Sequence, residues 1–211
     1  MFLRKKVVLL LIIGFMTFIV FACQRAPVEK YSLSAQELDL LQPGDIILRM
    51  GTGSLSKAIN SYLDEDLELS HIGILSNKES GRWMVIHSVS KHLSETDGLQ
   101  QQDLAAFVEE SVPRSIIITR LRKSALPEGL GLLMEQKALH YLAEKVPFDN
   151  SFSLEDQSRL YCSELIWQII RESAGINVFE EKNATHITMG FSAFLNPKYF
   201  EIIISHPGVL H

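Results

Sequence analysis

The chain has 211 residues, of which 46% are hydrophobic and 21% are charged, and its formal net charge is -5. This composition is that of an ordinary globular protein, long enough to bury the core of one domain. An acidic chain without a basic cluster in its body is not expected to bind nucleic acid, because neutralised phosphates supply most of that affinity.

The N-terminus has the layout of a secretory signal. Three basic residues, Arg4 to Lys6, precede an apolar run from Val7 to Phe21, and Ala22 precedes Cys23. A small residue directly before a cysteine resembles the lipobox of bacterial lipoproteins. We therefore predict a signal peptide over residues 1–22 and a lipidated Cys23. The alternative is an uncleaved N-terminal anchor, since the apolar run is almost long enough to span a membrane.

Lipidation would place the protein in the cell envelope, attached to a membrane by its N-terminus. Residues 23–33 carry no periodic signal and are interpreted as a tether, and residues 34–211 as the folded domain. Gln24 is not aspartate, and the sorting rule for bacterial lipoproteins then implies the outer membrane, facing the periplasm. The sequence does not indicate an oligomeric state.

The domain is expected to begin with a short helix and a strand. Ser34 and Glu37 form a capping-box pattern that opens a helix over residues 34–41, and Pro43-Gly44 ends it. Residues 45–50 then predict a strand, with Asp45 as a turn residue. Ser54 follows as the start of an amphipathic helix.

Two strand-like runs, residues 70–76 and 82–89, predict a hairpin across a five-residue loop. If Ser76 pairs with Arg82, His71 lies directly opposite His87, and their Cβ atoms are about 5 Å apart. One imidazole could then hydrogen-bond the other, although two unrelated surface or core histidines are the alternative. Ile72, Ile74, Met84 and Ile86 would form the apolar face.

The second half of the chain predicts a mixture of helices and strands. Residues 91–101 are polar and are interpreted as a loop, followed by a short helix near Leu104. Strands are expected over residues 115–121 and 199–205, and a helix over residues 128–145. The pattern favours a single α+β domain with a small antiparallel sheet.

Cys162 stands at the predicted first turn of another helix. Leu165, Ile166, Ile169 and Ile170 follow it at helical spacing, so the thiol shares the face that points to the core. Unpaired N–H groups and the helix dipole at this position favour a thiolate and predict a thiol pKa below the usual value of about 8.5. The alternative is an inert buried cysteine.

If Cys23 is lipidated, Cys162 has no disulfide partner in an oxidising compartment, which favours a reactive thiol. Its backbone N–H, at a helix start, is a natural donor to an oxyanion. Tyr161 and Ser163 beside it are candidate substrate-binding residues, with core packing and helix capping as the alternatives. Phe148 and Phe152 could shape a cleft.

Four stretches together resemble the circularly permuted branch of the NlpC/P60 papain-like superfamily, the YiiX/YebB-like cysteine hydrolases. They are Pro43 to Leu48, Ser70 to Ile74, Met84 to Ser88 and Tyr161 to Leu165. In this branch the histidine strand precedes the cysteine helix, as it does here. The resemblance implies a papain-like fold with the small antiparallel sheet packed against the cysteine helix.

The resemblance also implies roles for three side chains. Cys162 matches the nucleophile, His71 the general base, and His87 the third position, which orients the base. Many permuted members have glutamate at that third position, so His87 departs from their pattern. No cofactor is implied.

We expect a cysteine hydrolase that cleaves an amide bond through a thioacyl-enzyme, in a cell-wall peptide or a related envelope substrate. The resemblance leaves open a lipid-directed acyl hydrolase or acyltransferase. Two alternative hypotheses assign the chain to other functional classes: a non-catalytic peptide-binding lipoprotein, and a metallohydrolase that uses His71, His87 and His92. The histidines of the metallohydrolase hypothesis lack a recognised metal-ligand spacing.

Overall fold

A computed structural model of the chain describes residues 30–63, 68–77, 81–122, 128–154, 156–179 and 190–206. The predicted signal peptide and Cys23 lie outside these residues. Residues 31–211 form one compact unit. At the end of the predicted tether, Tyr31 and Leu33 pack against the core. Within the described residues, no helix is both long enough and apolar enough to cross a membrane.

The described elements follow the predicted order with two additions. They are α2 (Ala35–Leu38), β1 (Ile46–Arg49), α3 (Ser54–Leu63), β2 (His71–Ser76), β3 (Met84–Val89), β4 (Gly98–Asp103), α4 (Leu104–Glu109), β5 (Ile117–Leu121), α5 (Leu130–Glu144), α6 (Cys162–Ala174), the 3₁₀ helix η2 (Ser192–Leu195) and β6 (Phe200–Ser205). The additions are β4 and η2, and the prediction of a loop throughout residues 91–101 was therefore wrong for its last residues.

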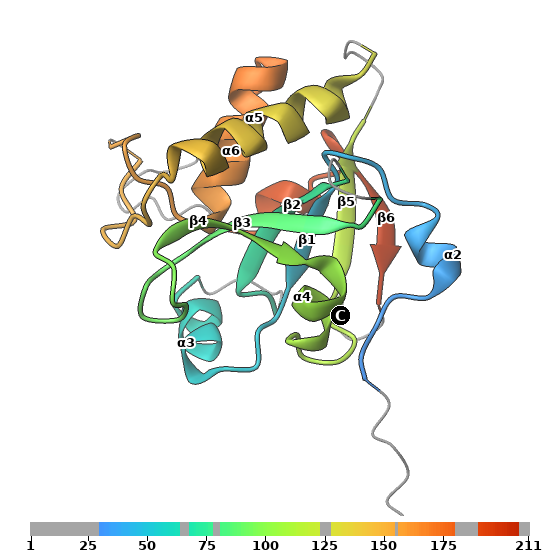
Figure 1. Cartoon of the computed structure of the whole chain (residues 1–211), viewed down its shortest axis with the longest axis horizontal. Helices are drawn as coiled ribbons and strands as arrows, with labels where there is room; N and C mark the ends of the chain where they lie inside the picture. Colours follow the sequence, from blue (N-terminus) through green and yellow to red (C-terminus); the bar gives the residue numbers. More distant parts are fainter. Residues whose placement is uncertain are drawn as a thin grey trace, which may run out of the picture. The chain divides into compact units, whose positions relative to one another are not determined.

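The strands form one six-stranded antiparallel sheet in the order β4-β3-β2-β1-β5-β6. Helices α5 and α6 lie together over one face, and α4 lies on the other side (Figure 1). Helix α6 packs on β2 and β3 in the middle of the sheet. The predicted α+β class, with a small antiparallel sheet against the cysteine helix, is confirmed.

Alternation of side chains along the strands divides the core into two layers. Ile72, Ile74 and Ile86 face α5 and α6, as the sequence pattern predicts. Leu75 and Val85 face the opposite way and pack with Phe107 of α4. Because residue numbers alternate between the faces, His71 and His87 belong to the α4 side.

The predicted hairpin register was wrong. Ser76 pairs with Met84 and Ile74 with Ile86, whereas the sequence argument paired Ser76 with Arg82. The loop is two residues longer than assumed, so His71 and His87 are diagonal rather than directly opposed. A shift of two residues leaves both on the same face of the hairpin, because side chains alternate with a period of two. The prediction that the two histidines lie close together is therefore correct, although the register was not.

The turn before β1 is held by Asp45. Its buried carboxylate accepts the backbone N–H of Gln42 at 2.8 Å and pairs with Arg120 Nε at 2.6 Å. The prediction of a structural role in a turn is confirmed. This contact fixes the start of β1, and with it the position of Arg49 at the other end of the strand.

Candidate active site

Cys162 is the first residue of α6, as predicted. Leu165, Ile166, Ile169 and Ile170 are buried against the sheet. The Glu164 carboxylate accepts the backbone N–H of Tyr161 at 3.3 Å, which fixes the turn on which the thiol stands. Glu164 is itself buried, and burial raises the pKa of its carboxyl to about 8.

The prediction of a lowered pKa for the Cys162 thiol was wrong. Hydrogen bonds from the backbone of Ser163, Ile72 and Cys162 do lower it, as a helix start predicts, but burial outweighs them and raises the pKa to about 11. A thiol with this pKa is protonated at neutral pH. The same hydrogen bonds locate the sulfur, because Ile72 is the residue that follows His71.

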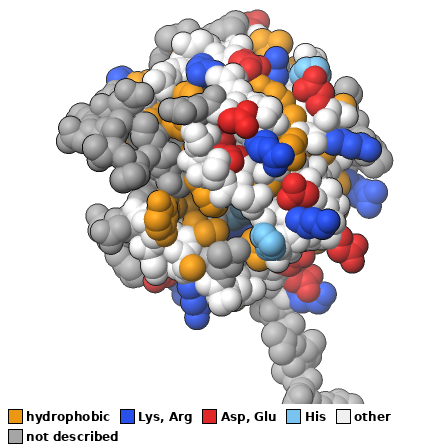
Figure 2. Space-filling view, turned by 90° about the vertical axis from the view of Figure 1, so that its left-hand side faces the viewer, with side chains coloured by type: hydrophobic (Ala, Val, Ile, Leu, Met, Phe, Trp, Pro, Cys, Tyr) orange, Lys and Arg blue, Asp and Glu red, His pale blue; other side chains and the backbone are white. Residues whose placement is uncertain are grey.

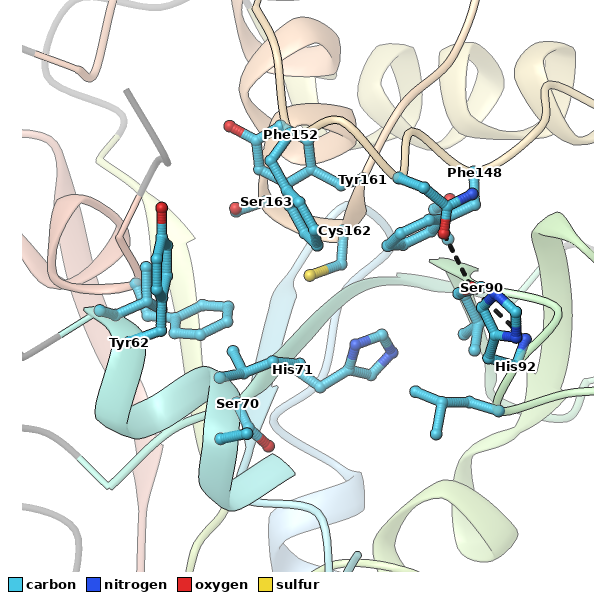
Figure 3. Close-up of a pocket in the computed structure, with 18 residues that line it drawn as sticks. Tyr62, Ser70, His71, Ser90, His92, Phe148, Phe152, Tyr161, Cys162 and Ser163 are labelled. Atoms are coloured by element: carbon cyan, nitrogen blue, oxygen red, sulfur yellow. Dashed lines mark hydrogen bonds between the residues drawn. The ribbon is translucent and has the colours of Figure 1, made fainter. Parts of the chain in front are cut away.

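The two histidines are hydrogen-bonded to each other. His71 Nε2 lies 2.7 Å from His87 Nδ1, and their ring centroids are 5.0 Å apart. His71 and Cys162 line one cavity, and the sulfur points into it on the side of His71 (Figure 3). The structure thus brings together the three side chains that the sequence singled out.

The hydrogen bond determines which ring nitrogen can serve as a base. If His71 Nε2–H donates to His87 Nδ1, the Nδ1 of His71 keeps its lone pair and can accept the thiol proton. His87 then carries its proton on Nε2, which is buried and has no hydrogen-bond partner among the described residues. The arrangement therefore requires a neutral His87.

Burial, with a smaller effect of Arg49, keeps both rings neutral. Burial, followed by the Arg49 guanidinium, lowers the pKa of His87 to about 3. Burial also lowers the pKa of His71 well below its usual value, with smaller effects of His87 and Arg49. The two causes act together, because each disfavours a positive charge on the rings.

Phe107 and Arg49 form the support of the histidine pair. The Phe107 ring lies 5.8 Å from His71 and 5.4 Å from His87, centroid to centroid. The Arg49 guanidinium lies 3.9 Å from the centre of the Phe107 ring and donates to the Phe107 carbonyl at 2.6 Å. Sequence analysis missed both roles. The one signal for Arg49 is a charged residue at the end of the apolar run Ile46 to Leu48.

The residues predicted to contact substrate lie in the wall of the cavity. Tyr161 and Ser163 are almost fully buried beside Cys162, and both line it. Phe148 and Phe152 also line it, as the sequence suggested, and their ring centroids are 5.9 Å apart. A role in binding substrate remains a prediction for these residues.

The metal alternative needs a third ligand beside the histidine pair. His92 lines the cavity, but no group of three or more His, Cys, Asp or Glu side chains among the described residues is placed to hold a metal ion. The described donor set does not fit a metal centre.

Residues 40–200 match the model of a family described as permuted papain-like amidase enzymes, YaeF/YiiX, C92. The chain belongs to this family. YiiX of Escherichia coli (strain K12) is 30% identical over 146 residues, which cover 67% of this chain and 63% of YiiX. The match thus spans less than two thirds of that relative.

A solved structure confirms the fold independently. The crystal structure titled metalloprotein yiiX, from Escherichia coli O157:H7, superposes with a TM-score of 0.62 at 22% identity, covering 78% of this chain and 97% of that one. The predicted papain-like fold is confirmed, and the family is described as one of amidases, the class of enzyme that the sequence predicts.

Proposed function

We propose that the protein hydrolyses an amide bond through a thioacyl-enzyme, with Cys162 as nucleophile, His71 as general base and His87 as the residue that orients it. The observation that carries this proposal is the 2.7 Å contact between His71 Nε2 and His87 Nδ1 beside the cavity that Cys162 opens onto. This contact holds the His71 ring by its Nε2 and leaves its Nδ1 available. A general base that is fixed in place needs one such free nitrogen.

The first half of the reaction forms the thioester. His71 Nδ1 takes the thiol proton as the sulfur attacks the carbonyl carbon, because the resting thiol is protonated. The backbone N–H of Cys162 donates to the oxyanion that forms. The C–N bond then breaks, and His71 returns the proton to the leaving amine.

The second half releases the acyl group. Water enters beside His71, which removes a proton as the water oxygen attacks the thioester carbon. The C–S bond breaks, and the thiolate recovers its proton from the His71 imidazolium. Throughout the cycle a neutral His87 accepts the His71 Nε2–H and fixes the plane of the ring.

Trapping the thioester tests this proposal. Mixing the full chain with an activated acetyl ester and quenching in acid should give one acetyl adduct, removable by hydroxylamine, on the peptide that contains Cys162. His71→Ala should form the adduct far more slowly, because the thiol loses its base. Adducts confined to other residues, or none at all, would favour the non-catalytic peptide-binding alternative.

We also propose that Cys23 is lipidated and that the protein is anchored at the outer membrane, on the strength of the basic, apolar and Ala22-Cys23 sequence. Cys23→Ala should abolish fatty-acid labelling and leave an unprocessed precursor. Labelling that survives this change would exclude the lipobox. Cell fractionation of the wild type reports which membrane holds it.

A further inference from the structure

Two helices of the chain begin with the same contact, in which a glutamate of the first turn accepts the backbone N–H of the residue before the helix. Glu37 accepts the N–H of Ser34 at 2.7 Å, and Glu164 accepts that of Tyr161 at 3.3 Å. Hydrogen bonds to a charged carboxylate are short, about 2.7–2.9 Å, and those to a neutral acceptor are longer. The Glu37 contact has the length expected of a charged acceptor, whereas the Glu164 contact does not.

The surroundings of the two carboxyl groups differ in the same sense. Glu37 is partly exposed, and its Oε1 also lies 2.7 Å from Nε2 of His206. Glu164 is fully buried, and its Oε1 has no hydrogen-bond partner among the described residues. A charge buried with an unfilled acceptor costs much more free energy than a neutral acid in the same place. The interior around Glu164 therefore favours a protonated carboxyl group.

Nearby charges reinforce the effect of burial on Glu164. Burial raises the pKa of its carboxyl group to about 8, against the opposing effect of the Tyr161 hydrogen bond. Asp149 and Asp156, in the segment before α6, add to this rise, and Arg171 on the same helix lowers the pKa by less. The carboxyl group is then mostly neutral at pH ~7.

Glu164 is linked to the nucleophile through the turn that they share. Tyr161, whose N–H it accepts, directly precedes Cys162, and the Tyr161 ring lies 5.4 Å from that of Phe152 in the wall of the cavity. Hydrophobic side chains also surround a hollow on the side of the molecule where α3, which lines the cavity, lies (Figure 2). A charge on Glu164 would need water, and the turn would have to open to admit it.

Resting on the proposed function, we propose that Glu164 is a positioning residue for Cys162 and that it works only as a neutral carboxylic acid. While Glu164 is protonated, the turn excludes water and the thiol stays on the side of His71. When Glu164 loses its proton, the turn opens and His71 no longer reaches the thiol proton. The enzyme therefore loses activity in mild alkali, where the thiol itself is still protonated.

The pH dependence of Cys162 acylation by an activated acetyl ester tests this proposal on the full chain. In Glu164→Gln the side-chain amide can still accept the Tyr161 N–H but cannot ionise. The ratio of its acylation rate to that of the wild type should stay close to 1 at pH ~7 and rise about tenfold for each pH unit above ~8, as the wild type loses its neutral carboxyl group. Glu164→Ala, which leaves the N–H unpaired, should be slower than the wild type at pH ~7 by about tenfold. A ratio of Glu164→Gln to wild type that does not change with pH would overturn the inference.

Thermal unfolding provides a readout that does not involve catalysis. A carboxyl group whose pKa is raised in the folded protein costs more stability as the pH rises from its usual pKa of 4.5 to about 8, because the folded state binds the proton more tightly than the unfolded state. Glu164→Gln should therefore gain in Tm over the wild type across this range, with no further gain above pH ~8.

Glu37→Gln is the matched control for the unfolding measurement. At neutral pH it should lose Tm, because it removes a charged carboxylate from its contacts with Ser34 and His206. A Tm that is lower in Glu164→Gln than in the wild type at pH ~8 would mean that the Glu164 carboxylate is charged at rest, as at Glu37, and would contradict the inference.

Failure of the inference can be told apart from failure of the proposed function. If the ester acylates Cys162 with the same pH dependence in the wild type and in Glu164→Gln, the thioacyl mechanism stands and Glu164 is only a structural cap. If Cys162 is not acylated at any pH, the mechanism itself is wrong, and the positioning role of Glu164 falls with it.

Discussion

Replacing either Cys162 or His71 by alanine is expected to lower kcat/KM by at least about 10³-fold for any amide that the wild type hydrolyses. Replacing both should cost no more than the larger single loss, because catalytic residues that act as a unit are not additive. Without the sulfur no acyl-enzyme forms. Without His71 a thiol whose pKa is raised to about 11 has nothing to take its proton.

His140→Ala provides the matched control for this measurement. His140 is an exposed histidine of α5 that pairs with Glu144 at 3.4 Å, and its loss should leave kcat/KM unchanged. Losses that add in the double variant would show that Cys162 and His71 work independently. Retention of a tenth of the activity in His71→Ala would remove it from the role of base.

The sequence singles out the three candidate residues for separate reasons. Cys162 is marked by the helical spacing of the apolar residues behind it. His71 and His87 are marked by their places in two adjacent strand-like runs. The register error did not separate the histidines, because it was an even number of residues.

Other features depend on contacts that no local pattern encodes. Arg49 lies beside His71 because β1 pairs with β2 in a particular register, with Arg49 opposite His71. Strand β4 was not predicted, because it is an edge strand with three consecutive glutamines, Gln100 to Gln102, and lacks alternating apolar residues. The thiol pKa depends on the depth of burial, whereas the sequence reveals only the helix start.

His87 offers a second test, because it is the hydrogen-bond partner of His71. In the wild type, burial and Arg49 hold the pKa of His71 well below its usual value, so the base stays unprotonated in mild acid. The acid limb of the kcat/KM profile should therefore lie below pH ~6.5, the usual value for histidine. Alkylation of Cys162 should rise about tenfold per pH unit through the neutral range, because its thiol pKa is raised to about 11.

His87→Glu should reverse these electrostatics. The new carboxylate would lie beside His71 and within reach of the Arg49 charge, and an opposite charge at this range favours the imidazolium by about 1–3 pKa units. The acid limb should then move to higher pH, since a protonated His71 cannot accept the thiol proton. Alkylation of Cys162 at pH ~7 should accelerate, because a neighbouring imidazolium stabilises the thiolate.

His87→Ala separates orientation from charge. It removes the partner of His71 Nε2 without adding a carboxylate, so the acid limb of the kcat/KM profile should stay at low pH. The value of kcat should fall, by up to about 10⁴-fold if the orienting partner is essential. His87→Glu should retain more activity than His87→Ala, because it still accepts the His71 Nε2–H. The rate of alkylation at the Cys162 peptide, measured against pH, shows whether the resting pair is neutral or charged. A wild-type rate already at its plateau at pH ~7 would mean that the thiolate and imidazolium exist at rest, and that burial does not keep the pair neutral.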